Sequence, residues 1–174
     1  MKIRRATVED ADGIALARVR GWQHGYRGIM PQVFLDNLAT EASPRLRNRL
    51  ENPAPNTENY VAETADGVIV GWANVGPYRT IEDPAQLDPG EGGELYALYL
   101  HTEYWGRGIA AELLDVGLTY LRQIQLLPYR LWVLRDNERA RRFYEKHGFT
   151  FDKTEASFSM PDGTELPEVR YTRA

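Results

Sequence analysis

The stretch that decides the fold lies in the second half of the chain and reads Leu95-Tyr96-Ala97-Leu98-Tyr99-Leu100-His101-Thr102-Glu103-Tyr104-Trp105-Gly106-Arg107-Gly108-Ile109-Ala110. Residues 95–100 are apolar or aromatic and predict a β-strand. Gly106 and Gly108 follow as a turn in which the backbone can approach a ligand, because glycine has no Cβ in the way. Residues from Gly106 to about Gln123 predict a helix whose apolar stripe comprises Ile109, Leu113, Gly117 and Leu121.

A strand that runs through such a turn into a helix suits a pyrophosphate, since the helix start adds unsatisfied N–H donors and a positive dipole end. A tight turn without a ligand is the alternative for a Gly-x-Gly pair taken alone. A P-loop would require a Lys-Ser or Lys-Thr pair directly after its last glycine, and this turn has none. The dinucleotide fingerprint fits Gly106, Gly108 and Ala111, but its acid, Asp136, comes about 30 residues on where about 20 are expected. Too few residues then remain to complete a doubly wound sheet.

Elements on either side of this stretch predict an α+β fold with mixed α/β layers. Residues 3–7 predict a first strand, and Thr7 to Asp10 a capping box that starts a helix ending at about Arg20. An Asp66-Gly67 turn predicts a hairpin, whereas residues 77–93, with three Pro and four acidic residues, predict a loop. The other expected elements are helices over 32–38, 42–50 and 137–147, and strands over 129–134, 149–158 and 165–172.

Length and composition indicate a single globular domain spanning residues 1–174, with 43% apolar and 26% charged residues. The absence of cysteine excludes disulfides, thiolate zinc sites and thiol nucleophiles. A net charge of −4 argues against nucleic-acid binding, and no apolar run reaches the roughly 18 residues that a membrane helix needs. Acidic residues from Glu9 onward interrupt any signal-peptide core, so we expect a cytoplasmic protein.

A second motif follows the strand at 129–134 and reads Asp136-Asn137-Glu138-Arg139-Ala140-Arg141-Arg142-Phe143-Tyr144-Glu145-Lys146-His147-Gly148-Phe149. It resembles the Asn-x-x-Ala-x-x-Phe-Tyr-x-x-x-Gly-Phe pattern of the GNAT acetyltransferase superfamily. The phosphate motif of that family, Arg/Gln-x-x-Gly-x-Gly/Ala, is matched at Gly108 and Ala110, with Trp105 in place of its first residue. The resemblance implies a GNAT-like fold, in which a central, mostly antiparallel sheet contains a β-α-β acyl-CoA-binding core and is flanked by helices.

The same resemblance implies acetyl-CoA as cosubstrate, with no metal, and homodimers are common among such proteins. The backbone groups expected to bond the pantetheine arm are those of Leu98, Tyr99 and Leu100. The amides expected to hold the pyrophosphate are those of Gly106, Arg107, Gly108, Ile109, Ala110 and Ala111. The Arg107 side chain either adds charge or is simply solvated. Asn137 reaches the pantetheine arm, caps the helix, or does both.

Tyr144 corresponds to the family's proton donor to the departing thiolate, and its alternative is an aromatic packed beside Phe143 and Phe149. The strand 131–134 carries no acid, so Glu94 is the nearest candidate for a general base acting through water. A carboxylate pointing into solvent is the alternative for Glu94. His24 and His101 are weaker candidates, and His147 is a favourable partner of a helix C-terminus.

Two functions therefore compete. One is an N-acetyltransferase that moves an acetyl group from acetyl-CoA to a primary amine of a small molecule or peptide, which the presence of Tyr144 favours. The other is a non-catalytic acyl-CoA-binding module, for which the missing acid on 131–134 leaves room. Four aromatic side chains either form a partly aromatic acceptor wall or pack in the core, namely Trp22, Tyr26, Tyr78 and Tyr96. Acids that favour a cationic acceptor, or are simply solvated, are Glu82, Asp83, Asp88, Glu91 and Glu94.

Overall fold

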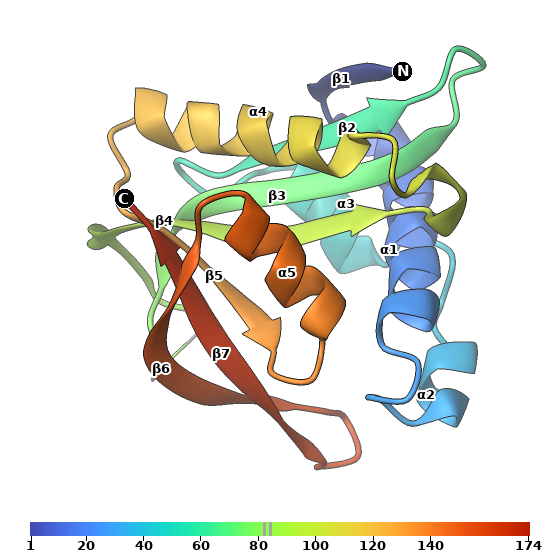
Figure 1. Cartoon of the computed structure of the whole chain (residues 1–174). Helices are drawn as coiled ribbons and strands as arrows, with labels where there is room; N and C mark the ends of the chain where they lie inside the picture. The colour runs from blue at the N-terminus through green and yellow to red at the C-terminus, as the bar shows by residue number, and fades with distance from the viewer. Residues whose placement is uncertain (82, 84) are drawn as a thin grey trace.

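The computed structural model describes residues 1–81, 83 and 85–174, and this part of the chain forms one seven-stranded sheet with helices on both faces (Figure 1). The strand order is β1-β2-β3-β4-β5-β7-β6, and among the described strands β4 and β5 are the one parallel pair of neighbours. The strands are β1 (Lys2–Arg5), β2 (Glu58–Glu63), β3 (Ile69–Arg79), β4 (Leu87–Leu100), β5 (Tyr129–Leu134), β6 (Thr150–Ser159) and β7 (Glu165–Arg173). The helices are α1 (Ala11–Gly25), α2 (Gln32–Asp36), α3 (Pro44–Glu51), α4 (Ile109–Gln123) and α5 (Glu138–Lys146). The predicted mostly antiparallel sheet with flanking helices is confirmed.

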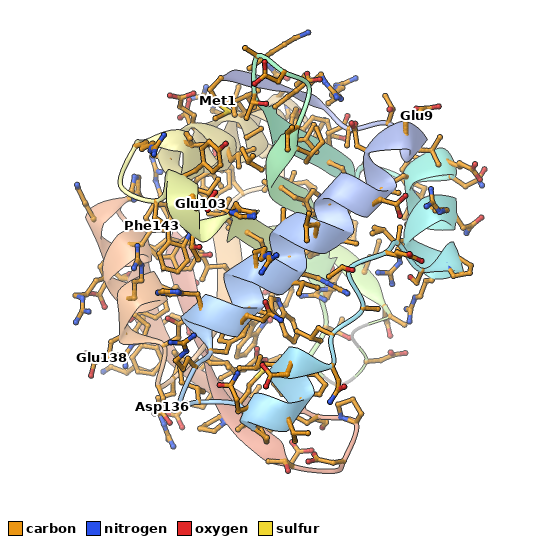
Figure 2. All side chains as sticks on the ribbon, turned by 90° about the vertical axis from the view of Figure 1, so that its right-hand side faces the viewer. Met1, Glu9, Glu103, Asp136, Glu138 and Phe143 are labelled. Atoms are coloured by element: carbon orange, nitrogen blue, oxygen red, sulfur yellow. The ribbon has the colours of Figure 1, made fainter. Side chains whose placement is uncertain are left out.

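The helices form two layers, one on each face of the sheet. The apolar stripe of α4 and one side of α5 pack on the main core, where Leu113 and Leu121 are fully buried. Burying a leucine of this kind stabilises the fold by about 1.5–3 kcal/mol. On the opposite face, Ile14 of α1 packs with β2 and β3, and Leu35 of α2 packs beside Leu134 of β5. Figure 2 shows α1 crossing this second face diagonally, with α2 beyond its C-terminal end.

Helix α1 continues to Gly25 instead of ending at about Arg20, which corrects the sequence prediction. The glycines in this helix are contact points rather than breaks. A Cβ on Gly13 would lie 2.6 Å from the Ile69 Cβ, and a Cβ on Gly21 would lie 3.4 Å from the Tyr99 Cβ. Small residues therefore let α1 lie directly on β3 and β4.

The expected loop over 77–93 is also corrected, because most of it belongs to a hairpin. Strand β3 runs to Arg79 and β4 begins at Leu87. Their pairing passes from Pro77–Gly93 to Tyr78–Asp88, so a bulge absorbs the residues between Asp88 and Gly93. Proline is tolerated at such irregular positions, which is why the prolines did not exclude a strand. Glu82 and Pro84 lie outside the described residues.

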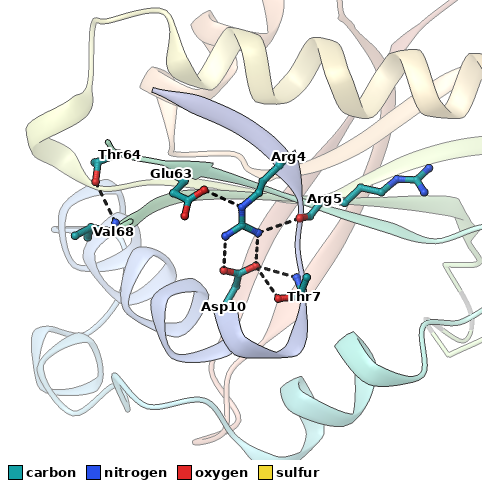
Figure 3. A network of polar contacts seen from close by, with 7 residues as sticks. All are labelled: Arg4, Arg5, Thr7, Asp10, Glu63, Thr64 and Val68. Atoms are coloured by element: carbon teal, nitrogen blue, oxygen red, sulfur yellow. Dashed lines mark hydrogen bonds and ion pairs between the residues drawn. The ribbon is translucent and has the colours of Figure 1, made fainter. Parts of the chain in front are cut away.

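An ion-pair network fixes the first strand to the sheet and to the start of α1 (Figure 3). The guanidinium of Arg4 donates to both oxygens of Asp10 at 2.7 and 2.8 Å and to Glu63 at 2.8 Å. Asp10 also accepts from the Thr7 backbone N–H at 2.8 Å, which confirms the predicted capping box. Burial alone would raise the pKa of Asp10, but the bonds from Arg4 and Thr7 lower that pKa overall.

The feature that creates the site is a split between β4 and β5. These strands pair only over Gly93–Leu95 and Tyr129–Leu131. On its other side β4 has a bulge, because the pairing with β3 skips Tyr96 between Asn74–Ala97 and Val75–Leu95. Beyond Leu95, within the described residues, β4 stays paired with β3 while β5 stays paired with β7. The edge of β4 that faces β5 is therefore open over residues 96–100.

Candidate active site

A cavity of about 1000 Å³ occupies this split and reaches both helical layers. On one side it is lined by the start of α4 and by α5, and on the other by α1, β6 and β7. The open ends of β4 and β5 lie between these two sides. We call the first side the α4–α5 half and the second the α1–β7 half.

The glycine-rich turn lines the α4–α5 half with backbone. Gly106 and Gly108 have φ values of +75° and +81°, and a Cβ on either would meet no described atom within 4 Å. Gly108 is the N-cap of α4, so the N–H groups of the helix's first turn have no partner within the helix. The turn therefore offers donors, a positive dipole end and the room that a pyrophosphate needs. The cavity is lined by Gly106, Gly108, Ile109, Ala110 and Ala111.

Arg107 is not among the residues that line the cavity. Its guanidinium lies 5.3 Å from the ring centroid of Tyr104. The structure places the Arg107 side chain away from the cavity, which favours a solvated side chain over one that adds charge to the site. A bond from the Arg107 backbone amide to a ligand stays a prediction.

The open edge of β4 suits an extended ligand that carries amides. Leu98, Tyr99 and Leu100 line the cavity and pair on their other side with residues 71–73 of β3. One carbonyl of this segment already has a donor, since the Trp105 indole N–H donates to the Leu100 oxygen at 2.9 Å. A ligand lying along this edge could add itself to the sheet as a further strand.

Cationic side chains of α5 face the same half of the cavity. The lining there includes Arg139, Arg142 and Lys146, and the Arg139 guanidinium lies 3.6 Å from the Trp105 ring centroid. Asn137 also lines the cavity while its side-chain oxygen accepts the Ala140 N–H at 3.1 Å, so it caps α5. The donors, the open strand edge and these positive charges fit an anionic ligand with an amide-bearing arm, such as coenzyme A.

Tyr144 belongs to α5, in the α4–α5 half, and lies near Tyr99 of β4. Its ring packs edge-on against Phe143 and Phe149, with centroids 5.3 and 6.0 Å away, and it also lines the cavity. Its hydroxyl has no hydrogen-bond partner among the described residues. Burial raises the pKa of Tyr144, and the neighbouring Tyr99 acts in the same direction, so the phenol keeps its proton at neutral pH. Its role as proton donor stays a prediction.

Glu94 does not point into solvent, so the structure excludes that alternative. Its side chain is fully buried and paired with Arg79. The Arg79 backbone N–H donates to Oε2 at 2.9 Å, and the guanidinium donates to Oε1 through Nε at 3.1 Å and through Nη2. The physical reason is register: Glu94 lies opposite Gly76 and Arg130, in the middle of the sheet rather than at its edge. A catalytic role for Glu94 stays a prediction.

Three of the four aromatic residues expected in the acceptor wall line the cavity, namely Trp22, Tyr26 and Tyr96. Tyr78 does not, since only 3% of its surface is exposed and its hydroxyl accepts from Arg170 at 2.9 Å. Among the expected acids, Asp83, Asp88 and Glu91 lie outside the cavity lining, and Glu91 pairs with Arg130 at 3.0 Å.

The three histidines do not cluster. His24 is exposed and packs against Trp105 at 4.8 Å between ring centroids, and His101 lies beside Glu103, with 3.8 Å between its Nδ1 and the carboxylate. Neither histidine lines the cavity. His147 does line it, at the C-terminal end of α5, and its Nδ1 lies 2.7 Å from the Phe143 carbonyl oxygen.

Sequence reasoning missed Arg79, Trp132 and Glu168 in the α1–β7 half. Burial raises the pKa of Glu168 to about 7; the charge of Arg79 opposes this and that of Glu94 adds to it. A signal for Glu168 was present, because alternation along β7 places Val169 and Tyr171 in the core and Glu168 on the opposite face. The sequence of β7 alone does not show what that opposite face contacts.

A split sheet with a glycine-rich helix start and an open strand edge defines a class of protein that binds an anionic, amide-bearing ligand beside an acceptor chamber. The model of the Acetyltransferase (GNAT) family matches residues 22–149. The uncharacterized N-acetyltransferase YuaI of Bacillus subtilis (strain 168) is 30% identical over 136 residues, which cover 78% of this chain and 72% of that protein. The spermidine N(1)-acetyltransferase of Thermoplasma acidophilum is 25% identical over 160 residues, which cover 90% of this chain and 92% of that protein.

Among solved structures, the PaiA N-acetyltransferase of Thermoplasma acidophilum in complex with coenzyme A has the same fold. It matches with a TM-score of 0.70 at 22% identity, over 97% of this chain and 96% of that chain. The chain belongs to the GNAT family of acetyltransferases. It is an acetyl-CoA-dependent N-acetyltransferase, and the predicted family and enzyme class are confirmed. No helix in the described part of the chain is long and apolar enough to cross a membrane.

Proposed function

We propose that this enzyme acetylates a primary amine of a small cationic acceptor, and that residues 1–174 act as a single domain. The observation that carries the proposal is the division of charge within one cavity. Cations and a helix start line the α4–α5 half, whereas the acids that line the cavity, Glu94 and Glu168, belong to the α1–β7 half among the described residues. Arg79 neutralises Glu94, so a negative charge at Glu168 is left to attract a cation.

Two further observations support a cationic acceptor. Trp22 and Tyr26 bring aromatic surface to the α1–β7 half, and aromatic rings attract ammonium groups as well as apolar carbon chains. A relative that matches most of this chain is a spermidine N(1)-acetyltransferase, which makes polyamines natural first candidates.

Acetyl-CoA supplies the acetyl thioester, and the remaining work belongs to the chain. We assign the amides of residues 106–111 to the pyrophosphate and the open edge of Leu98, Tyr99 and Leu100 to the pantetheine arm. N–H groups of that edge are also the donors available to the thioester oxygen. Tyr144 gives its hydroxyl proton to the departing sulfur. The alternative, a module that binds acyl-CoA without turnover, drew support from an acid missing on β5, and Glu168 on the neighbouring β7 weakens that support.

The test is release of free coenzyme A thiol from acetyl-CoA in the presence of an amine panel. The panel contains spermidine and spermine, an aminoglycoside, a peptide with a free N-terminus, and a monoamine without a second charged group, such as benzylamine. We expect the highest kcat/KM with the polyamines. Turnover of the peptide alone would refute the proposed acceptor class, and binding of acetyl-CoA without turnover of any amine would favour the non-catalytic module.

A further inference from the structure

Two carboxylates among the described residues line the cavity, and they differ in what they can still do. Glu94 is fully buried, and Arg79 donates to both of its oxygens. Glu168 is half-buried and lines the same cavity, and its carboxylate has no hydrogen bond or ion pair to any described residue. Acceptor chemistry needs a group that can take a proton from an ammonium ion, and a carboxylate whose oxygens are already occupied is poorly suited to that task.

The position of Glu168 follows from register. It lies opposite Leu134 of β5 on one side and Ala156 of β6 on the other, and residues opposite one another point to the same face of a sheet. Leu134 packs in the cluster formed with Met30 and Leu35, so this face is the one covered by α2. Glu168 therefore stands in the α1–β7 half of the cavity, where the acceptor is expected.

The charged groups around Glu168 leave its charge uncompensated. Arg79 lies near it but is held by Glu94. Arg170, two residues along β7, donates instead to Asp152 at 2.7 Å, Tyr78 at 2.9 Å and Thr154 at 2.9 Å. The phenols that feel Glu168 are Tyr26, which follows α1, and Tyr99 of β4, and burial raises the pKa of both, so they stay neutral. Arg18 of α1 acts on Tyr99, but the charges that act on Glu168 itself are those of Arg79 and Glu94.

We propose that Glu168 is the catalytic base that takes the proton from the acceptor ammonium, and that Arg79 and Glu94 are positioning residues that keep it free for this task. The inference rests on the proposed acetylation of a cationic amine. It also fits the titration of the group, because burial raises the pKa of Glu168 to about 7 and general bases work best near the operating pH.

The proton and electron balance is complete. One N–H bond of the ammonium breaks, its proton goes to a Glu168 oxygen, and nitrogen keeps the electron pair. That pair forms the bond to the acetyl carbon while the carbon–sulfur bond breaks and sulfur takes the released pair. Tyr144 protonates the sulfur and recovers the second proton from nitrogen. Glu168 then returns its proton to solvent, so each turnover releases one proton.

The experiment measures kcat/KM against pH from about 5.5 to 10, using the best acceptor of the amine panel and thiol release as the readout. Wild-type kcat/KM should rise with pH and level off above about pH 7. In Glu168→Gln the rate depends on free amine from bulk solution, so kcat/KM should keep rising tenfold per pH unit toward the amine's own pKa of about 10. The loss should be about 10²–10⁴-fold near pH 7.5 and should shrink as pH increases.

Two further variants separate this role from its alternatives. Glu94→Gln frees Arg79 to approach Glu168, so the plateau should remain and its onset should move to lower pH. The matched control is Glu155→Gln, an exposed acid on β6 whose pairing partner is Val169, on the opposite face from Glu168. It should follow the wild-type profile.

A Glu168→Gln profile parallel to wild type would overturn the proposal, and loss of the plateau in Glu94→Gln alone would assign the base to Glu94 instead. If wild type acetylates no amine, the proposed function fails before this inference is reached. The thermal shift produced by acetyl-CoA should be the same in all four proteins, which shows that each remains folded and binds the cosubstrate.

Discussion

Replacing Glu168 by glutamine also tests the electrostatics of the cavity through stability, independently of any acceptor. Burial raises the pKa of this carboxyl to about 7, whereas in an unfolded chain a glutamate titrates near about 4.3. The direction in which stability changes with pH follows from the difference in proton binding between the folded and unfolded chain. Between these two values the unfolded chain has released the proton that the folded chain still holds, so stability falls as pH rises from about 4.3 to about 7. Glutamine does not titrate and avoids this loss.

The magnitude can be bounded from the same values. The full gap corresponds to about 3–4 kcal/mol at about 1.36 kcal/mol per pH unit. Because Glu168 lines a water-accessible cavity, we expect roughly half of it, about 1–2 kcal/mol, above pH 7. At about 2–4 °C per kcal/mol for a chain of this size, the variant should melt about 2–8 °C higher than wild type at pH 8.5. Near pH 4.5 the two should melt together.

Thermal unfolding of wild type, Glu168→Gln and Glu155→Gln at half-unit steps from pH 4.5 to 8.5 measures this directly. The difference between wild type and Glu168→Gln should grow with pH and level off above about pH 7, while Glu155→Gln should show no such trend. A difference that does not change with pH, or a variant less stable than wild type at pH 8.5, would show that Glu168 is not a desolvated carboxyl. A gain in stability joined to a loss of activity is the pattern expected of a group kept for function.

The remaining predictions concern the cosubstrate side and the N-terminal corner. Tyr144→Phe should lower kcat by about 10²–10⁴-fold in the thiol assay with little change in melting temperature, since the hydroxyl has no described partner to lose; an unchanged kcat would leave Tyr144 with packing alone. Gly108→Ala should lower the free energy of unfolding by about 1–2 kcal/mol in thermal unfolding, because φ is +81° at this position. The variant should also reduce the stabilisation by acetyl-CoA, which in wild type should be roughly 2.7 kcal/mol at about a hundred times Kd. An equal stabilisation of wild type by NAD would contradict acetyl-CoA as the cosubstrate. Asp10→Asn should lose about 2 kcal/mol at pH 7 by removing charged bonds to Arg4. Since the pKa of Asp10 is lowered, that cost should fade as pH drops below about 3.9, and a cost that persists at pH 2 would contradict it.

The α4–α5 half of the cavity was predictable because its chemistry is local in sequence. A strand, two glycines and a helix start lie within sixteen consecutive residues, and the donors they supply are backbone groups. Asn137 and Tyr144 follow in a second continuous motif. The same locality explains why β5 and the hairpin at Asp66-Gly67 were placed correctly. Periodicity and turn residues determine such features over a few positions.

The α1–β7 half was not predictable, because it is assembled from separate segments by register. Glu168 reaches the cavity only because β7 is inserted between β5 and β6, and a chain order cannot show that β7 lies inside the sheet. Glu94 looked like an acid at a strand entry because the segment before it, rich in proline and acids, resembled a loop. A bulge carries β4 through that segment, which moves Glu94 from an apparent edge to the interior and gives it Arg79 as a partner.

That change of place reassigns the chemistry between two otherwise similar carboxylates. A cation and a backbone N–H group compensate Glu94, and both occupy its oxygens. It is therefore a positioning residue for Arg79 rather than an acceptor of protons. Glu168 lacks that compensation, so its charge is costly until a cation arrives. An ammonium group entering from the α1–β7 half supplies the cation and the proton together, and the cost of burying Glu168 is then what drives the proton from nitrogen to oxygen.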